Sequence, residues 1–238
     1  MKIRPILFTP ENAKKSYLGS KTETRREVKP QPPQSAPSSI ECEWLDGTTG
    51  TQDYGFSNED RIWKCPYGGP GDRLWVREAF YIDHYEYLGA LTGLPPLTAA
   101  EQKNCLYYAA DGPVHDQIPE CEGIPKLKPA IFMPRWASRT TLEIVSVRVE
   151  RLQNITETDA IAEGIYSQFV NVEPLHMMKK WVASGVKMTC ANGDVSTEAP
   201  AFLSAKDAYR ALWNSINGKD AWGRNPFVWV LGYKRVFD

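Results

Sequence analysis

The polar stretch GSKTETRR, at residues 19–26, marks the point at which the first predicted strand and helix have ended. Before it, the apolar run from Ile3 to Phe8 predicts a short buried strand. A helix over 10–18 comes next, because Thr9 is a good N-cap, Pro10 suits the first helical position and Gly19 is a stop signal. The stretch itself is rich in functional groups, and we expect it to be a polar strand or loop.

Further strands are predicted from alternation and from apolar runs. Residues 72–78, DRLWVRE, alternate with a period of two, and residues 106–109 form a short strand. The apolar series over 142–149 changes parity after Ile144, which indicates a bulge or a strongly bent strand. A buried strand is expected from Phe227 to Val236.

Three later helices are predicted from capping residues and apolar stripes. The first starts at a capping box formed by Thr156 and Asp159 and ends at Gly164. The second has an apolar face made of Leu175, Met178, Trp181 and Val182, followed by Gly185. The third begins at Ser204 and has the strongest stripe, made of Ala205, Ala208, Tyr209, Leu212, Trp213 and Ile216, followed by Gly218. With no repeat and no doubly wound alternation, the sequence predicts a mixed, strand-dominated α+β fold.

Composition limits the classes of function. The chain has 238 residues, of which 42% are hydrophobic and 24% charged, so it can build an ordinary globular core. Its formal net charge is -1, and any nucleic-acid contact must therefore be a local basic patch. No run approaches the roughly 18 apolar residues of a membrane span, and the first apolar stretch is too short for a signal peptide. We expect a cytoplasmic protein without a membrane partner.

Cysteine and histidine spacing argues against disulfides and metal. The cysteines are odd in number and form no C-x-x-C: Cys42, Cys65, Cys105, Cys121 and Cys190. The histidines form no pair at helical spacing: His84, His115 and His176. Cys42 and Cys65 are the least implausible pair for a structural zinc, but reduced cysteines in core or loop are favoured. No metal and no cofactor is predicted.

Five segments, in order, carry a resemblance to a known family. The first contains a Gly-x-Lys-x-x-x-Arg element at residues 19–25. The others are CPYGGPGDRLWVRE at residues 65–78, MPRWASR at residues 133–139, and the stretches Arg148 to Gly164 and Pro226 to Val236. In these segments the chain resembles the ASCH family, in particular the long members found in phages and prophages.

The resemblance implies a PUA-like (ASCH) β-barrel with flanking helices and long loop insertions. We expect a single domain over 1–238, with insertions at about 31–62, 82–125 and 166–203, the first of them opening with a Pro-, Gln- and Ser-rich loop. The first and last strands should lie in one closed or nearly closed sheet. A bacterial, phage- or prophage-encoded protein is implied.

The same resemblance implies a function in RNA or modified-nucleoside handling. Small bacterial members are similar to N(4)-acetylcytidine amidohydrolases, whose proposed catalytic set falls on Lys21, Thr24 and Glu163. Other members are described as RNA-binding modules or ribonucleases, and a fold does not select among these activities. The alternatives are therefore an amidohydrolase acting on an N(4)-acylated cytidine, a non-catalytic RNA-binding module, and a ribonuclease.

Metal-free amide hydrolysis needs an activated hydroxyl or water. Thr24 can supply the hydroxyl, Lys21 can act as its base once desolvated, and Glu163 can orient the lysine or transfer a proton. A cation near the carbonyl can stabilise the oxyanion or bind a phosphate; the candidates are Arg25, Arg26 and Arg139. The structural alternative is a Lys21–Glu163 ion pair that braces the first helix.

A second candidate binding set lies in residues 126–139, KLKPAIFMPRWASR. Its members are Arg135, Trp136, Ser138 and Arg139, with Lys126 and Lys128 upstream. Arginines suit phosphates and Trp136 offers a stacking face, although a core Trp136 with solvated arginines is the alternative. In the strand at 72–78, Trp75 and Arg77 share a face and are predicted to line a pocket. Glu78 points the other way and is predicted to form a salt bridge.

Overall fold

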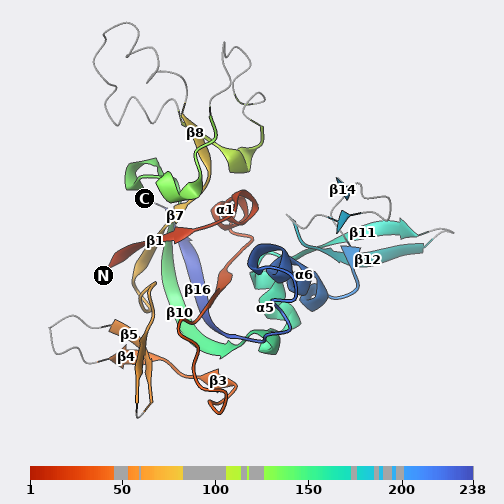
Figure 1. Cartoon of the computed structure of the whole chain (residues 1–238). Helices are drawn as coiled ribbons and strands as arrows, with labels where there is room; N and C mark the ends of the chain where they lie inside the picture. Colours follow the sequence, from red (N-terminus) through yellow and green to blue (C-terminus); the bar gives the residue numbers. More distant parts are fainter. Residues whose placement is uncertain are drawn as a thin grey trace, which may run out of the picture. The chain divides into compact units, whose positions relative to one another are not determined.

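A computed structural model describes residues 1–45, 53–58, 60–82, 106–113, 117, 126–172, 176–184, 188–189, 195–196 and 201–237. The chain divides into two compact units that alternate along the sequence. Figure 1 shows its helices and strands, coloured from the N-terminus to the C-terminus. Unit 1 comprises Met1–Gly19, Asp72–Glu143 and Arg235–Asp238, and unit 2 comprises Ser20–Gly71 and Ile144–Lys234. The predicted class is confirmed, since the described elements are mixed and strands dominate.

Unit 1 is built on the strand and helix predicted for the start of the chain. Strand β1 (Ile3–Leu7) pairs in parallel with β7 (Arg73–Arg77), with Ile3 opposite Arg73. Helix α1 (Pro10–Tyr17) begins where expected, because the Thr9 hydroxyl accepts a hydrogen bond from the Asn12 N–H. The first residues of β10 (Thr141–Arg151) pair antiparallel with β7.

The rest of the described unit 1 packs around a small apolar cluster. Strand β8 (Phe80–Ile82) pairs antiparallel with β9 (Leu106–Tyr108). Short 3-10 turns follow, namely η1 (Ala109–Asp111), η2 (Ala130–Phe132) and η3 (Arg135–Ala137). The buried cluster consists of Phe80, Leu106, Met133 and Ala137, with Trp75, Tyr108 and Trp136 packed against it.

Unit 2 contains the remainder of β10, β16 (Phe227–Val236) and β2 (Glu23–Glu27), in that order. Strand β16 pairs antiparallel with β2 from Val228 opposite Glu27 to Gly232 opposite Glu23. Strand β3 (Ser39–Ile40) pairs with β10. The parity change in β10 is confirmed, because Ile144, Val147 and Val149 are buried while the two residues after Ile144 are exposed. Among the described strands each unit forms open sheets, so the closed barrel remains a prediction.

All three predicted insertions hold regular structure in their described parts. The first contains a three-stranded antiparallel sheet, β4 (Glu43–Leu45), β5 (Asp53–Ser57) and β6 (Ile62–Lys64). The third contains two further sheets, made of β11 (Tyr166–Val172), β12 (His176–Val182) and β15 (Ala201–Phe202), and of β13 (Met188–Thr189) with β14 (Val195–Ser196). The described part of the second contributes β9 and η1.

The helix predicted through Met178 and Trp181 is wrong. These residues belong to β12, which pairs antiparallel with β11, with Trp181 opposite Ser167. Over so short a window, apolar spacing does not separate a helix from a strand, and cross-strand hydrogen bonding decides. Leu175 and Gly185 lie outside the described residues.

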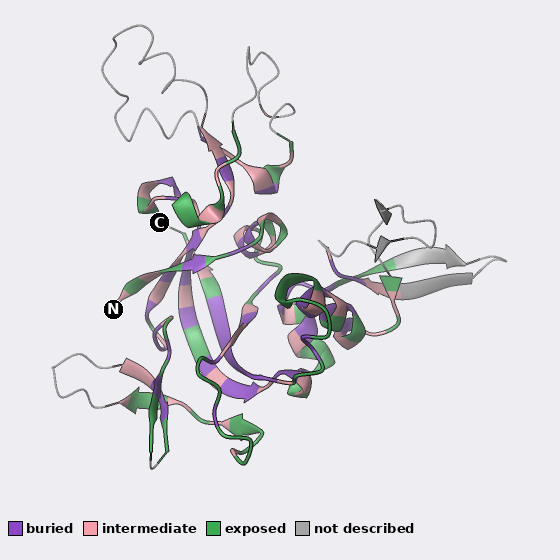
Figure 2. Cartoon of the chain, viewed as in Figure 1, coloured by how far each residue is buried: buried purple, intermediate pink, exposed green. Residues whose placement is uncertain are grey.

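The other two predicted helices are confirmed. Helix α5 (Glu157–Ala162) has a complete capping box, in which the Thr156 hydroxyl accepts from the Asp159 N–H and the Asp159 carboxylate accepts from the Thr156 N–H. Helix α6 (Ala205–Asn217) starts at Ser204 and ends at Gly218. Its predicted stripe is buried except for Ile216, which is 50% exposed. Figure 2 colours the chain by burial and shows both buried and exposed residues along the helices.

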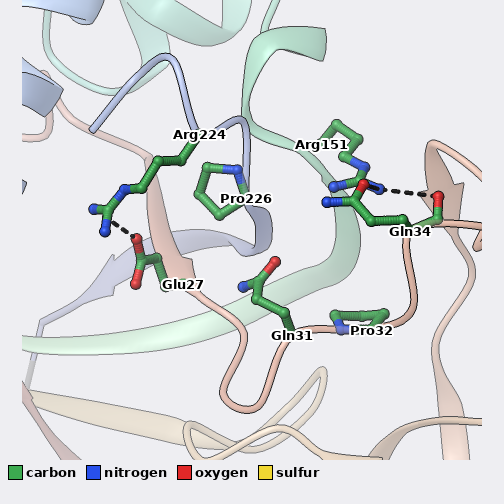
Figure 3. Close-up of a pocket in the computed structure, with 7 residues that line it drawn as sticks. All are labelled: Glu27, Gln31, Pro32, Gln34, Arg151, Arg224 and Pro226. Atoms are coloured by element: carbon green, nitrogen blue, oxygen red, sulfur yellow. Dashed lines mark hydrogen bonds and ion pairs between the residues drawn. The ribbon is translucent and has the colours of Figure 1, made fainter. Parts of the chain in front are cut away.

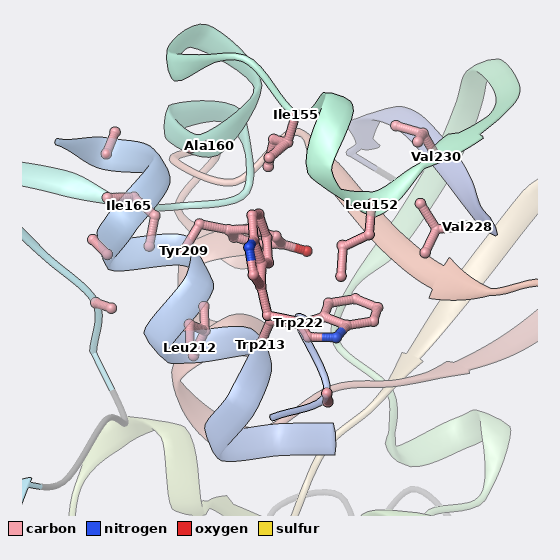
Figure 4. Close-up of a cluster of buried hydrophobic side chains, with 14 residues drawn as sticks. Leu152, Ile155, Ala160, Ile165, Tyr209, Leu212, Trp213, Trp222, Val228 and Val230 are labelled. Atoms are coloured by element: carbon pink, nitrogen blue, oxygen red, sulfur yellow. The ribbon is translucent and has the colours of Figure 1, made fainter. Parts of the chain in front are cut away.

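The main core of unit 2 joins α5, α6 and β16. Around Tyr209, Trp213 and Trp222 it gathers side chains from all three elements, as Figure 4 shows. The 3-10 turn η4 (Leu152–Asn154) adds Leu152, which is fully buried. Helix α5 packs against both α6 and β2. None of the described helices is long and apolar enough to cross a membrane.

Candidate functional site

Lys21 and Glu163 meet in the interior of unit 2. The Lys21 Nζ contacts the Glu163 carboxylate and donates to the Glu163 backbone oxygen at 2.9 Å. Both side chains are buried, at 1% and 4% exposure. The predicted proximity of these two residues is therefore present, across more than a hundred residues of sequence.

Local structure at each end explains this contact. Glu163 is the C-cap of α5, and the following Gly164 turns the chain with φ 92°, a conformation that glycine adopts without strain. Lys21 lies two residues before β2, and the neighbouring Thr22 N–H donates to the Ala162 oxygen at 2.8 Å. The end of α5 and the start of β2 are thus joined by backbone as well as side-chain contacts.

Arg25 is the centre of the charged cluster. Its guanidinium contacts Glu150 at 2.9 Å, Asp159 at 3.2 Å and Glu163 at 3.4 Å, and its side chain is fully buried. Glu23 lies 3.3 Å away, on the same face of β2. Arg25 is therefore committed to carboxylates within unit 2, instead of being free for a substrate phosphate.

Tyr209 supplies a third partner for Glu163. From α6 its hydroxyl donates to the Glu163 Oε1 at 3.2 Å, and the Arg25 guanidinium lies 6.0 Å from its ring centre. Sequence reasoning placed Tyr209 only in an apolar stripe. The apolar stripe correctly predicted that Tyr209 is buried. It could not predict the hydrogen bond of the hydroxyl, because the partner Glu163 lies at the end of a different helix.

Arg148 extends the cluster toward solvent. This residue of β10 contacts Glu23 at 3.0 Å and Asp159 at 3.3 Å, and its side chain is 33% exposed. Burial works against its charge, but the hydrogen bond to Glu23 and the nearby carboxylates raise its pKa. The alternation of Arg148 and Glu150 along one strand is the signal that could have revealed them.

The cluster perturbs the ionisation of its members. Burial lowers the pKa of Lys21, and although Glu163 opposes the shift, the charges of Arg26 and Arg25 support it. Burial also works against the charge of Arg25, but Glu163, Tyr209 and Glu150 together outweigh it and raise the pKa of Arg25. Burial, followed by the charge of Glu163, raises the pKa of Tyr209 well above its ordinary value.

Thr24 is not brought into this contact. It is buried in β2, where its neighbour Arg25 points to the opposite face of the strand. Within the described part of the chain, no hydrogen bond joins the Thr24 hydroxyl to Lys21 or Glu163. Arg26 lies opposite Trp229 in the β2–β16 ladder and acts on Lys21 through its charge.

The second predicted set lies in unit 1, and most of its polar groups are already engaged. Arg139 binds Glu78 at 3.0 Å and also contacts Asp111, and its guanidinium stacks 3.9 Å from the ring centre of Tyr108. The salt bridge predicted for Glu78 is thus present. The Ser138 hydroxyl donates to the Val76 oxygen at 2.8 Å, which makes it a structural contact.

Trp75 and Arg77 share a half-exposed face of β7, as the alternation predicted. Arg77 lies 5.3 Å and Arg135 5.9 Å from the Trp75 ring centre. Arg77 also donates to the Met133 oxygen at 3.1 Å. Arg135 is exposed, whereas Trp136 is half-buried against the apolar cluster of unit 1.

A cavity of about 190 Å³ in unit 2 lies outside both predicted sets. It is lined by Glu27, Gln31, Pro32, Gln34, Arg151, Arg224 and Pro226 (Figure 3). Arg224 pairs with Glu27 at 3.6 Å, and Arg151 donates to the Gln34 side chain at 2.8 Å. Its polar groups therefore satisfy one another, and we assign it no ligand.

Cys42 and Cys65 are both reduced, and burial, helped by Cys65, raises the pKa of Cys42 to about 12. No group of three potential metal ligands occurs among the described residues. His84, His115, Cys105, Cys121 and Cys190 lie outside them.

Comparison with known proteins adds no relative. No family model, no curated protein and no solved structure matches the chain. The function is therefore inferred from the residues of the two units.

Proposed function

We propose that this chain is an ASCH-type, PUA-like protein that acts on RNA or a modified nucleoside. In this proposal unit 2 is a metal-independent amidohydrolase that removes the acyl group from an N(4)-acylated cytidine. One observation carries it: a fully buried lysine, with a lowered pKa, is held by a carboxylate inside a charged cluster. Perturbed ionisation of this kind is characteristic of catalytic sites. The implied setting is the cytoplasm of a bacterial cell, with a phage or prophage as the source of the gene.

The reaction can be written with these residues alone. The neutral amine of Lys21 takes a proton from water, and the hydroxide attacks the acyl carbonyl carbon. The C–N bond to the cytosine then breaks, and the protonated Lys21 returns its proton to the departing exocyclic nitrogen. Glu163 orients Lys21 throughout, and Tyr209 holds Glu163. The products are a carboxylic acid and cytidine.

Water takes the place of Thr24 as nucleophile in this scheme. The Thr24 hydroxyl makes no hydrogen bond to Lys21 or Glu163 within the described residues, and a base must reach the proton that it removes. Because the Lys21 side chain is 1% exposed, the acyl group reaches it only when the polar cluster opens. A Thr24→Val variant should keep turnover, whereas a nucleophilic Thr24 would make this variant inactive.

The decisive experiment measures hydrolysis directly. Purified protein is incubated with N(4)-acetylcytidine and the products are identified by mass spectrometry. We expect cytidine from the wild type and none from Lys21→Met. The matched control is Lys64→Met, because Lys64 is an exposed lysine of unit 2 that pairs with Asp53 on the surface. Equal turnover by wild type and Lys21→Met would refute the assigned role of Lys21.

Non-catalytic RNA binding is the second candidate. The exposed Arg135 favours it, since a guanidinium suits the phosphate of a nucleotide. RNA cleavage is the third activity that the resemblance implies. Including a short RNA in the same incubation separates these activities. Cleavage yields shorter RNA fragments, and deacylation converts N(4)-acetylcytidine to cytidine. A module that only binds RNA changes neither substrate.

A further inference from the structure

Exposed apolar and basic side chains occur together in the segment 126–135 of unit 1. Leu127 is 52%, Ile131 58% and Phe132 68% exposed. Lys126 and Arg135 are exposed on the same segment, and residues 126–139 contain no Asp or Glu. We call the side chains of Lys126, Leu127, Ile131, Phe132 and Arg135 the 126–135 platform.

The backbone beneath the platform is held firmly. Lys128 and Phe80 exchange two backbone hydrogen bonds, at 2.8 and 3.1 Å. Met133 is fully buried in the apolar cluster of unit 1, and its oxygen accepts from Arg77 at 3.1 Å. Arg77 also donates to the Ile131 oxygen. Since Met133 points inward on this anchored turn, its neighbours Ile131 and Phe132 are held facing solvent.

The half-buried tryptophans nearby are less suited to bind a ligand. Trp75 has guanidinium groups at 5.3 and 5.9 Å from its ring centre, and Trp136 packs against the apolar cluster. Phe132 is much more exposed and has no ring or cation partner within the described residues. It is therefore the aromatic group of this segment that is available to a partner.

We propose that the 126–135 platform binds single-stranded nucleic acid. Phe132 stacks on an unpaired base, and Lys126 and Arg135 contact the adjacent phosphates. Aromatic side chains among basic residues are the usual means of holding a single strand, and the absence of acidic residues makes the segment complementary to a polyanion. The inference deepens the nucleic-acid part of the proposed function, on which it rests, and is independent of hydrolysis at Lys21.

Binding of a fluorescein-labelled oligouridine, followed by fluorescence anisotropy, tests this. Loss of one stacked base predicts that Phe132→Ser raises the Kd about 5- to 150-fold. Phe132→Trp should bind at least as tightly as the wild type. The matched control is Leu203→Ser, which removes another apolar side chain, 76% exposed, from unit 2 and should leave the Kd unchanged.

The basic residues have a separate signature. If Lys126 contacts a phosphate, Lys126→Gln should reduce the slope of log Kd against log salt by about 0.7. Loss of binding in Phe132→Ser together with a normal thermal unfolding curve supports the platform. An unchanged Kd in Phe132→Ser, or an equal loss in Leu203→Ser, overturns it. So does binding to vesicles containing phosphatidylserine but not to RNA, because the partner would then be an anionic membrane.

The deacylation assay keeps this test apart from the proposed reaction. Phe132→Ser should hydrolyse the free nucleoside as fast as the wild type. RNA binding that depends on Phe132, without hydrolysis of the nucleoside, would support the platform and refute the amidohydrolase. Hydrolysis without RNA binding would refute the platform alone.

Discussion

The Lys21 ammonium contacts both the carboxylate and the backbone carbonyl oxygen of Glu163, in the interior of unit 2. A buried ammonium is costly unless it is paired and hydrogen-bonded. Here both requirements are met by one residue at the end of α5. The contact therefore ties the segment before β2 to α5, and it also lets Glu163 bias the protonation of Lys21.

Lys21→Met should destabilise the chain by about 3 kcal/mol. The change leaves the Glu163 carboxylate buried with Arg25 and Tyr209 as its remaining partners, and breaking a buried pair on one side is strongly unfavourable. Urea denaturation measures the loss. Lys64→Met removes a surface pair and should cost no more than about 1 kcal/mol. A similar loss of stability in both variants would show that the buried Lys21–Glu163 pair contributes no more than a surface ion pair.

The free energy of unfolding should depend on pH through Lys21. Its pKa in the folded chain lies below the ordinary 10.5, so the unfolded chain holds more protons between these two values. Stability from this group therefore rises with pH across that interval, and the cost of the buried ammonium is fully present below it. The difference in stability between wild type and Lys21→Met should grow as the pH rises toward about 10. A difference that is constant with pH would contradict the lowered pKa.

Tyr209→Phe should cost about 1.5–3 kcal/mol, because it removes a hydrogen bond donated to a buried carboxylate. The comparison is Tyr54→Phe, which removes a hydrogen bond of 2.9 Å to the uncharged backbone oxygen of Cys42 and should cost only about 1 kcal/mol. Thermal or urea unfolding of both variants ranks them. The reverse order would show that Glu163 gains little from Tyr209.

Gly55→Ala should be destabilising by about 1–3 kcal/mol or more. A Cβ at this position of β5 would overlap the backbone oxygen of Trp63 and lie 3.0 Å from its carbonyl carbon. Because the obstacle is backbone, strand β6 must move. Gly223→Ala is the control, since its nearest obstacle is one backbone oxygen at 3.3 Å. Circular dichroism during urea unfolding compares them, and equal stability of the two variants would disprove a forced shift of β6.

Short sequence patterns correctly predicted the helices that begin at a capping residue. Helix α5 starts at its capping box, α1 at Thr9 and α6 at Ser204, because a cap requires only residues three positions apart. The alternation of residues in β7 correctly predicted which face of the strand is buried, because this pattern also depends only on neighbouring positions. The helix expected through Met178 failed because the partner strand β11, which decides its conformation, lies outside any local pattern.

The sequence by itself determined the element order at the start of the chain, the caps, the strand-dominated class and the candidacy of Lys21 and Glu163. Only the tertiary structure decided what surrounds that pair. It added Tyr209, Glu150 and Asp159, committed Arg25 to carboxylates and left Thr24 without a hydrogen bond to the pair. The physical reason is range: capping and alternation act over a few residues, whereas desolvation and charge pairing depend on groups that meet only when distant strands and helices pack.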